Sequence, residues 1–105
     1  MGKQKIGILI ANENKDVHIL IAATLVLKEY EVYKTFSANE CLSKLEEFEG
    51  KVDVLLVDGA IAADRGGMVI VNAKGINPGI KILAVAEDES EKTRVLDYGA
   101  DGFTH

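Results

Sequence analysis

Three polar residues stand close behind apolar runs, at positions where buried strands are expected to end. Asn12 and Glu13 follow the run at residues 6–10, and Asp58 follows a second such run. A carboxylate that leaves a buried strand is a candidate for ligand binding or catalysis, because loops at strand ends carry functional residues. The structural alternative is that Asp58 caps the next segment or forms an Asx turn with Gly59.

Other familiar arrangements of reactive side chains are missing from the sequence. It contains no glycine-rich phosphate loop, no Ser-His-Asp set and no His-Cys metal-ligand spacing, so a conventional enzyme is not expected. The one cysteine, Cys41, excludes an internal disulfide and lies at a core position of a predicted helix, where we expect it to be unreactive.

Composition and charge narrow the class of protein further. The net charge is -5, with acidic and basic residues mixed along the chain, so direct nucleic-acid binding through phosphate contacts is not expected. The sequence shows no signal-peptide pattern and no apolar stretch long enough to cross a bilayer. Together with the single cysteine, these features favour a cytoplasmic protein that does not enter membranes.

Short apolar runs alternate with longer amphipathic segments, and these elements must position the polar residues. The apolar runs predict five strands, at residues 6–10, 31–36, 52–57, 80–86 and from 102 onward. The amphipathic segments predict four helices, at residues 15–30, 37–48, 68–74 and 88–98. We expect the stretch between residues 58 and 68 to be a loop.

This alternation predicts a single α/β domain over residues 1–105, with a doubly wound parallel sheet and helices on both faces. In such a sheet the carboxyl ends of the strands meet at one edge, and ligands bind there near the point where the strand order reverses. We therefore expect Asn12, Glu13 and Asp58 to converge at that edge.

Five segments carry a resemblance that extends through the whole chain. They are ILIANEN at 8–14, DVLLVD at 53–58, Gly66, NPGIKIL at 77–83 and YGADGF at 98–103. In their order and spacing they resemble the receiver domains of two-component response regulators. The resemblance implies a flavodoxin-like, CheY-like fold with strand order 2-1-3-4-5 and a role in phosphorelay signal transduction.

In that family, carboxylates after the first and third strands hold Mg²⁺, and the aspartate that ends the third strand accepts a phosphoryl group from a kinase phosphohistidine. The resemblance implies that Asp58 is the phosphoacceptor and that Glu13 and Asp58 are both direct ligands of Mg²⁺. Asn12 would lie in the second shell, and the backbone carbonyl of Ala60 would be a further ligand. The implied partner is a histidine kinase or a phosphotransfer protein.

The chain departs from the family at several of these positions. Asn12 replaces a carboxylate, which weakens the expected metal site, and Glu13 stands where an aspartate is usual. The hydroxyl residue that ends the fourth strand in the family aligns with Ala86 or with Ala84, and neither has a hydroxyl. The aromatic residue of the family's switch aligns with Phe103.

The phosphate-binding lysine and the final helix of the family would fall beyond His105. Without that helix we expect a strip of apolar sheet to be exposed, and a homodimer would cover it. These losses leave a second hypothesis open, a pseudo-receiver that binds a protein partner or dimerises without phosphorylation. A cofactor-binding flavodoxin-like module is a third hypothesis.

One further motif favours cobalamin only weakly. Asp16 and His18 are spaced as in the Asp-x-His motif of cobalamin-binding domains, but the required glycines are absent at Ile21 and at Glu87-Asp88. We therefore predict that His18 is a solvent-facing helix residue. The acidic cluster at residues 87–91 is predicted to be a solvated helix start.

Overall fold

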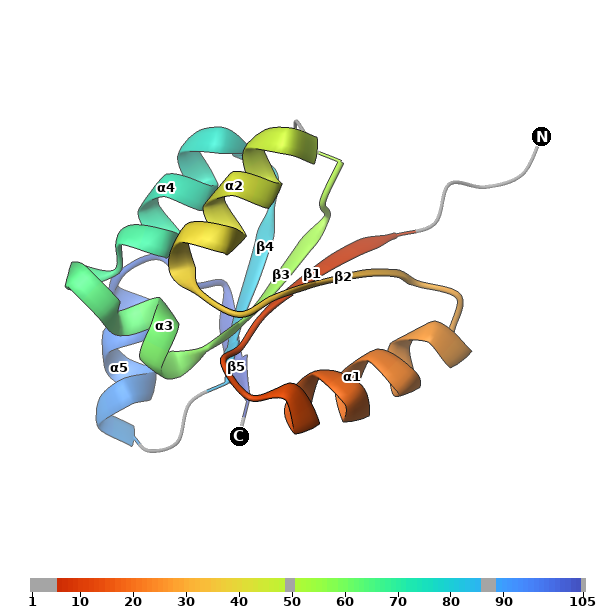
Figure 1. Ribbon diagram of the computed structural model, residues 1–105. Coiled ribbons are helices and arrows are strands. Elements are labelled where there is room, and N and C mark those ends of the chain that lie inside the picture. The colour runs from red at the N-terminus through yellow and green to blue at the C-terminus, as the bar shows by residue number, and fades with distance from the viewer. Residues whose placement is uncertain (1–5, 49–50, 86–88, 105) are drawn as a thin grey trace.

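The computed structural model describes residues 6–48, 51–85 and 89–104. It contains a parallel five-stranded sheet in the order β2-β1-β3-β4-β5, which confirms the predicted topology (Figure 1). The strands are β1 (Gly7–Ala11), β2 (Glu31–Thr35), β3 (Val54–Asp58), β4 (Lys81–Val85) and β5 (Gly102–Thr104). The helices are α1 (Lys15–Leu27), α2 (Ala38–Phe48), α3 (Gly59–Ala63), α4 (Met68–Ile76), α5 (Glu89–Asp97) and a 3-10 turn, η1 (Asp64–Gly66).

The two faces of the sheet are covered unequally. Helix α1 lies on one side of the sheet, and α2, α3, α4 and α5 lie on the other (Figure 1). Strand β1 is buried along its whole length, as its continuous apolar run predicted. The main core lies beneath the larger group of helices and is built from alternate residues of the three central strands: Leu9, Ala11, Leu55, Val57, Ile82 and Ala84.

On the face of the sheet that packs against α1, side chains become more exposed from β1 toward β4. Ile10 of β1 is buried, its register partner Leu56 on β3 is half-buried, and the next partner, Leu83 on β4, is 39% exposed. Register partners point to the same side of a sheet. Leu83 is therefore an exposed apolar residue on this face of β4, and an exposed strip covered by a second copy of the chain stays a prediction.

The segment after β3 is helical, where the sequence predicted a loop, so the described residues form five α-helices and not four. Ile61 and Ala62 of α3 are buried, and small apolar side chains of this kind favour a helical turn against the core. A helix of five residues is too short to show a helical period in the sequence. The chain passes into α4 through Gly67, whose φ is 79°.

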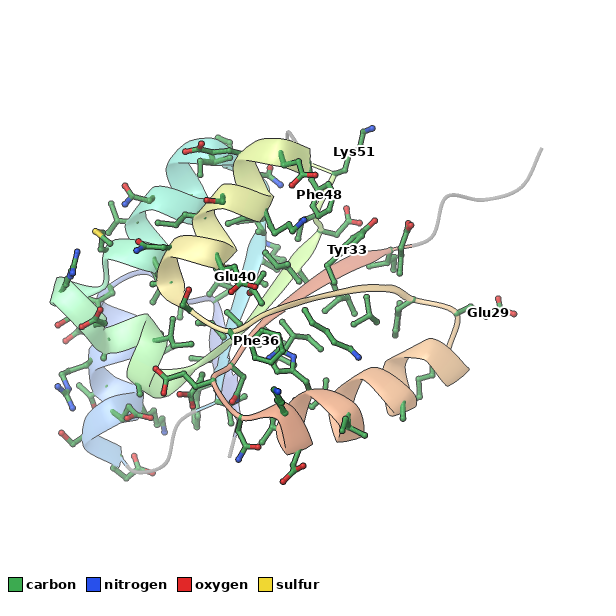
Figure 2. The ribbon with its side chains drawn as sticks, viewed as in Figure 1. Glu29, Tyr33, Phe36, Glu40, Phe48 and Lys51 are labelled. Carbon is green, nitrogen blue, oxygen red and sulfur yellow. The ribbon has the colours of Figure 1, made fainter. Side chains whose placement is uncertain are left out.

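The helix boundaries follow local signals. Helix α1 ends at Leu27 rather than at residue 30, and Glu29, with a φ of 64°, adopts the left-handed conformation that terminates helices. The predicted cap of α2 is confirmed, because the Ser37 hydroxyl oxygen accepts a hydrogen bond from the Glu40 N–H at 3.2 Å. Figure 2 shows Glu40 at the start of this helix.

Helix α2 is fixed to the sheet by buried apolar side chains. Cys41 and Leu45 are buried, which confirms the predicted core position of the cysteine. Burial raises the pKa of the Cys41 thiol to about 12, so the reactive thiolate is absent at neutral pH. The ring of Phe48, at the end of the helix, packs against that of Tyr33 on β2, with 4.4 Å between the ring centroids (Figure 2).

Asp101 connects α4 to the edge of the sheet. Its carboxylate accepts hydrogen bonds from the Ile82 N–H at 2.8 Å and from the Lys74 ammonium at 2.7 Å. The same ammonium donates to the carbonyl of Ile80 at 2.8 Å. Partial burial acts to raise the pKa of Asp101, but these hydrogen bonds and the charges of Lys74 and Lys81 outweigh it and lower the pKa overall.

We expect the Asp101→Asn substitution to lower the free energy of unfolding at pH 7 by about 1 kcal/mol, a value reduced for solvent screening. Because the pKa is lower in the folded than in the unfolded chain, the stabilisation is complete above the ordinary value of 3.8 and is lost as the pH falls through the folded-state pKa. Urea unfolding of wild type and variant at pH 7 and at about pH 2.5 measures this change.

The exposed Asp97 of α5 supplies the control for Asp101. Asp97→Asn should change the free energy of unfolding by less than about 0.5 kcal/mol at either pH. The explanation would be contradicted by an Asp101→Asn effect of the same size at both pH values, because the carboxylate charge would then contribute nothing.

No helix within the described residues is long and apolar enough to cross a membrane.

Candidate functional site

Strands β1 and β3 end side by side and bring the predicted site residues to one edge of the sheet. Ala11 pairs with Val57 in the register, so Asn12 and Asp58 are the next residues along the two strands. After β1 the chain leads to α1 on one face, and after β3 it leads to α3 and α4 on the other (Figure 1). This divergence marks the switch point where ligands bind in such sheets.

Asp58 is the last residue of β3 and occupies the N-cap position of α3, with a half-buried side chain. Its carboxylate makes no capping hydrogen bond to the first turn of that helix. The hypothesis that this side chain serves as a helix cap is therefore wrong. The residue lies at the carboxyl edge, at the end of a central strand.

Asn12 organises the loop that follows β1. Its side-chain oxygen accepts a hydrogen bond from the Asn14 N–H at 2.8 Å, which forms an Asx turn, and its own N–H donates to the Thr35 carbonyl at 3.1 Å. The side chain is 8% exposed. Asn12 thus stabilises the loop through these two hydrogen bonds. Its role in the second shell of a metal ion stays a prediction.

Glu13 is exposed and lines a pocket of about 330 Å³ at the carboxyl edge. The pocket joins the loop after β1 to the starts of α2, α3 and α4 and to η1. Besides Glu13, its polar lining comprises Ser37, Asn39, Asp64 and Arg65, and Ala60 contributes an apolar wall. The structure therefore places Glu13 and Ala60 in one pocket, which Asp58 does not line.

Sequence reasoning assigned no role to Asp64 and Arg65, which it placed in a loop. Both lie in η1 and line the same pocket as Glu13, although about fifty residues separate the two segments in the chain. Arg65 has a φ of 49°, a left-handed conformation that is rare for residues other than glycine. No sequence pattern indicated this placement, because it depends on the unpredicted turn of α3.

Ala60 lies within the first turn of α3. Carbonyl groups of a helix point along its axis toward its C-terminus, and Asp58 stands at the opposite end. The predicted ligation through that carbonyl stays a prediction, and the residue's observed place is the pocket wall.

The carboxylates available for a metal are few. No group of three or more His, Cys, Asp or Glu side chains in the described parts of the chain is placed to hold a metal ion. Mg²⁺ is commonly held by one or two carboxylates, with water completing its octahedron. Glu13 and Asp58, from neighbouring strand ends, supply two, so the donor set fits a Mg²⁺ site with few protein ligands.

The residues that align with the family's switch positions lie in different places. Ala84 pairs with Val57, is fully buried and precedes the end of β4, so it does not face the carboxyl edge. Ala86 lies outside the described residues. Phe103 on β5 is half-buried, and the Lys92 ammonium lies 4.2 Å from its ring centroid, a cation–π contact.

The structure corrects the prediction for His18. The side chain is 1% exposed and does not face solvent, whereas the neighbouring Ile19 is 61% exposed. Helix α1 is apolar on nearly every side, so its sequence does not identify the buried face.

Within the predicted solvated acidic cluster, Glu89 is exposed but Glu91 is half-buried against the backbone of Gly59. Glu87 and Asp88 lie outside the described residues.

No family model and no curated relative matches this sequence. Solved structures do match. A response regulator protein from Burkholderia pseudomallei, with a phosphorylated aspartic acid, a calcium ion and citrate, matches with a TM-score of 0.82 and 19% identity, over 95% of this chain and 59% of that one. A CheY-like response regulator receiver domain protein from Methanospirillum hungatei matches with a TM-score of 0.81 and 24% identity, over 96% of this chain and 81% of that one.

This chain has the fold of response regulator receiver domains. A third structure, the P1 domain of CheA3 in complex with CheY6 from R. sphaeroides, matches with a TM-score of 0.80 and 21% identity, over 97% of this chain and 82% of that one. Since the matches extend over nearly the whole chain, the receiver fold includes the edge that carries Glu13 and Asp58.

Proposed function

We propose that this chain is a signalling domain in which Asp58 accepts a phosphoryl group from the phosphohistidine of a histidine kinase or phosphotransfer protein. The observation that carries the proposal is the position of Asp58. It ends a central strand of a receiver fold, at the switch point, with a half-buried carboxylate that does not cap α3.

In the proposed step an oxygen of the Asp58 carboxylate attacks the phosphorus atom of the phosphohistidine. The P–N bond breaks as the P–O bond forms, and the histidine nitrogen keeps the electron pair. Glu13 and Asp58 would hold Mg²⁺, which when bound neutralises charge on the phosphoryl oxygens. Asn12 and the Asx turn keep Glu13 at the edge of the pocket.

Two structural neighbours support the class of reaction and partner. One contains a phosphorylated aspartic acid together with a calcium ion, which is a divalent cation. The other is a complex between the P1 domain of CheA3 and CheY6. A kinase or phosphotransfer domain is therefore the proposed partner class, and a second copy covering Leu83 is the proposed dimer partner.

A specific observation favours a second candidate function, a pseudo-receiver that binds its partner without phosphorylation. The first position of the predicted metal site carries Asn12, which has no charge and whose side-chain oxygen already accepts the hydrogen bond of the Asx turn. In this candidate function the same edge of the sheet would serve for protein recognition alone.

The test is intact-mass measurement after incubation with acetyl phosphate and Mg²⁺. We expect wild type to gain one phosphoryl group in Mg²⁺ and none when EDTA removes the metal. Glu13→Gln should slow the gain about tenfold, because it removes one of two carboxylate ligands. Glu40→Gln, an exposed change in the first turn of α2, is the control and should react at the wild-type rate. Absence of an adduct under every condition would favour the pseudo-receiver.

A further inference from the structure

His18 is a buried side chain that the proposed phosphoryl transfer does not use. It lies in the first turn of α1 and is 1% exposed. Its ring packs against Phe36, with 4.5 Å between the ring centroids. Figure 2 shows Phe36 just beyond the end of β2. The His18 Nε2 atom lies 2.6 Å from the backbone oxygen of Asn12, which is a short hydrogen bond.

This contact determines which nitrogen of His18 carries the proton. A carbonyl oxygen can only accept a hydrogen bond, so Nε2 must be the donor. Nδ1 is buried without a hydrogen-bond partner among the described residues. The Nε2–H group is thus the His18 donor that is directed at Asn12.

The carbonyl of Asn12 belongs to the same rigid peptide group as the N–H of Glu13. Because a peptide unit is planar, fixing the direction of its C=O also fixes the direction of its N–H and of the bond leading to the next Cα atom. The hydrogen bond from His18 therefore restrains the point at which the exposed Glu13 side chain leaves the backbone.

Among the described residues, other hydrogen bonds hold the chain around this peptide group, and His18 adds the one to its carbonyl oxygen. The Asn12 N–H is bonded to the Thr35 carbonyl, and the Asn14 N–H is bonded to the Asn12 side chain. Thr35 is itself held by a hydrogen bond from its hydroxyl to the Ile10 carbonyl at 2.9 Å. His18 supplies the contact with the Asn12 carbonyl, across six residues of chain.

We propose that His18 is a positioning residue for the site: its Nε2–H holds the Asn12–Glu13 peptide plane and so directs the Glu13 carboxylate toward the edge that carries Asp58. The inference rests on the proposed function, because the role of Glu13 there is to bind Mg²⁺. It acts through the backbone of Asn12 and requires no contact between His18 and the metal.

A matched pair of variants tests the donor. His18→Gln and His18→Met place unbranched side chains of similar length at the same position, but only Gln has an N–H that can reach the Asn12 carbonyl. Cooperative urea unfolding shows that each variant is folded. His18→Phe, which keeps a ring against Phe36 without a donor, replaces the Met variant if that variant does not fold.

The first readout is the ¹⁵N relaxation order parameter of the Glu13 amide in the metal-free protein. We expect a rigid value of about 0.85 in wild type and His18→Gln, and a flexible value below about 0.6 in His18→Met. Phe36→Leu, which keeps the donor and removes the ring contact, should leave Glu13 rigid. Equal order in the Gln and Met variants would overturn the inference, as would loosening of Glu13 by Phe36→Leu to the same extent as by His18→Met.

The second readout is the dissociation constant for Mg²⁺ alone, from NMR titration. His18→Met should weaken binding about tenfold, and His18→Gln should restore it to within about twofold of wild type. Wild-type affinity in a folded His18→Met variant would overturn the inference. If wild type itself does not bind Mg²⁺, the proposed function fails, and the metal-free order parameters still decide whether His18 holds the loop.

Discussion

Asp58→Asn is expected to abolish the phosphoryl adduct that wild type forms with acetyl phosphate and Mg²⁺. The amide has the shape of the carboxylate but lacks the anionic oxygen that attacks phosphorus, so no P–O bond can form at this position. Intact mass detects the adduct, and peptide mapping locates it. Because Asp58 is half-buried at the edge of the sheet, the amide fits the same space and the fold should persist.

Asp64→Asn is the matched control for this experiment. Asp64 is an exposed carboxylate that lines the pocket together with Glu13, and its replacement removes one negative charge, as Asp58→Asn does. This variant should keep the adduct. Retention of the adduct in Asp58→Asn would reject Asp58 as the phosphoacceptor, whatever the result for Asp64→Asn.

The largest effect on stability is expected at Gly67. This residue is buried and has a φ of 79°, a conformation that costs other residues about 1–2 kcal/mol. A Cβ atom at this position would also overlap the ring of Tyr98, which adds an overpacking cost of about 1–3 kcal/mol. Gly67→Ala should therefore lower the free energy of unfolding by about 2–5 kcal/mol, measured by urea denaturation.

Gly75→Ala, in the same region of the chain, is expected to change the free energy of unfolding in the opposite direction. Gly75 lies inside α4, and a Cβ atom there would have no neighbour within 4 Å. Alanine should raise the free energy of unfolding by about 0.5–1 kcal/mol, because glycine loses more backbone entropy in a helix. If both substitutions changed stability by similar amounts in the same direction, the explanation based on Gly67 would fail.

The two substitutions also bear on the site. Gly67 connects η1, which carries the pocket residues Asp64 and Arg65, to α4. A distortion at Gly67 would move one wall of the pocket, whereas a change at Gly75, near the other end of α4, would not. The stability of this turn and the shape of the pocket therefore depend on the same close approach of Tyr98 to the backbone.

The sequence by itself determined the framework of the molecule. Its alternation of apolar runs and amphipathic segments predicted the order of strands and helices, and the position of Asp58 behind a continuous apolar run placed it at the carboxyl edge. Capping signals such as Ser37 predicted a helix start correctly. These features are local, because the period of a strand and the chemistry of a cap depend on residues a few positions apart.

Only the tertiary structure decided how the site is built. The turn α3, the presence of Arg65 and Glu13 in one pocket and the burial of His18 were absent from the prediction. Helix α1 is apolar almost all round, so its buried face is selected by packing against the sheet and Phe36, and not by its own periodicity. Contacts between segments far apart in the chain have no local signature, and these contacts fix the loop that carries Glu13.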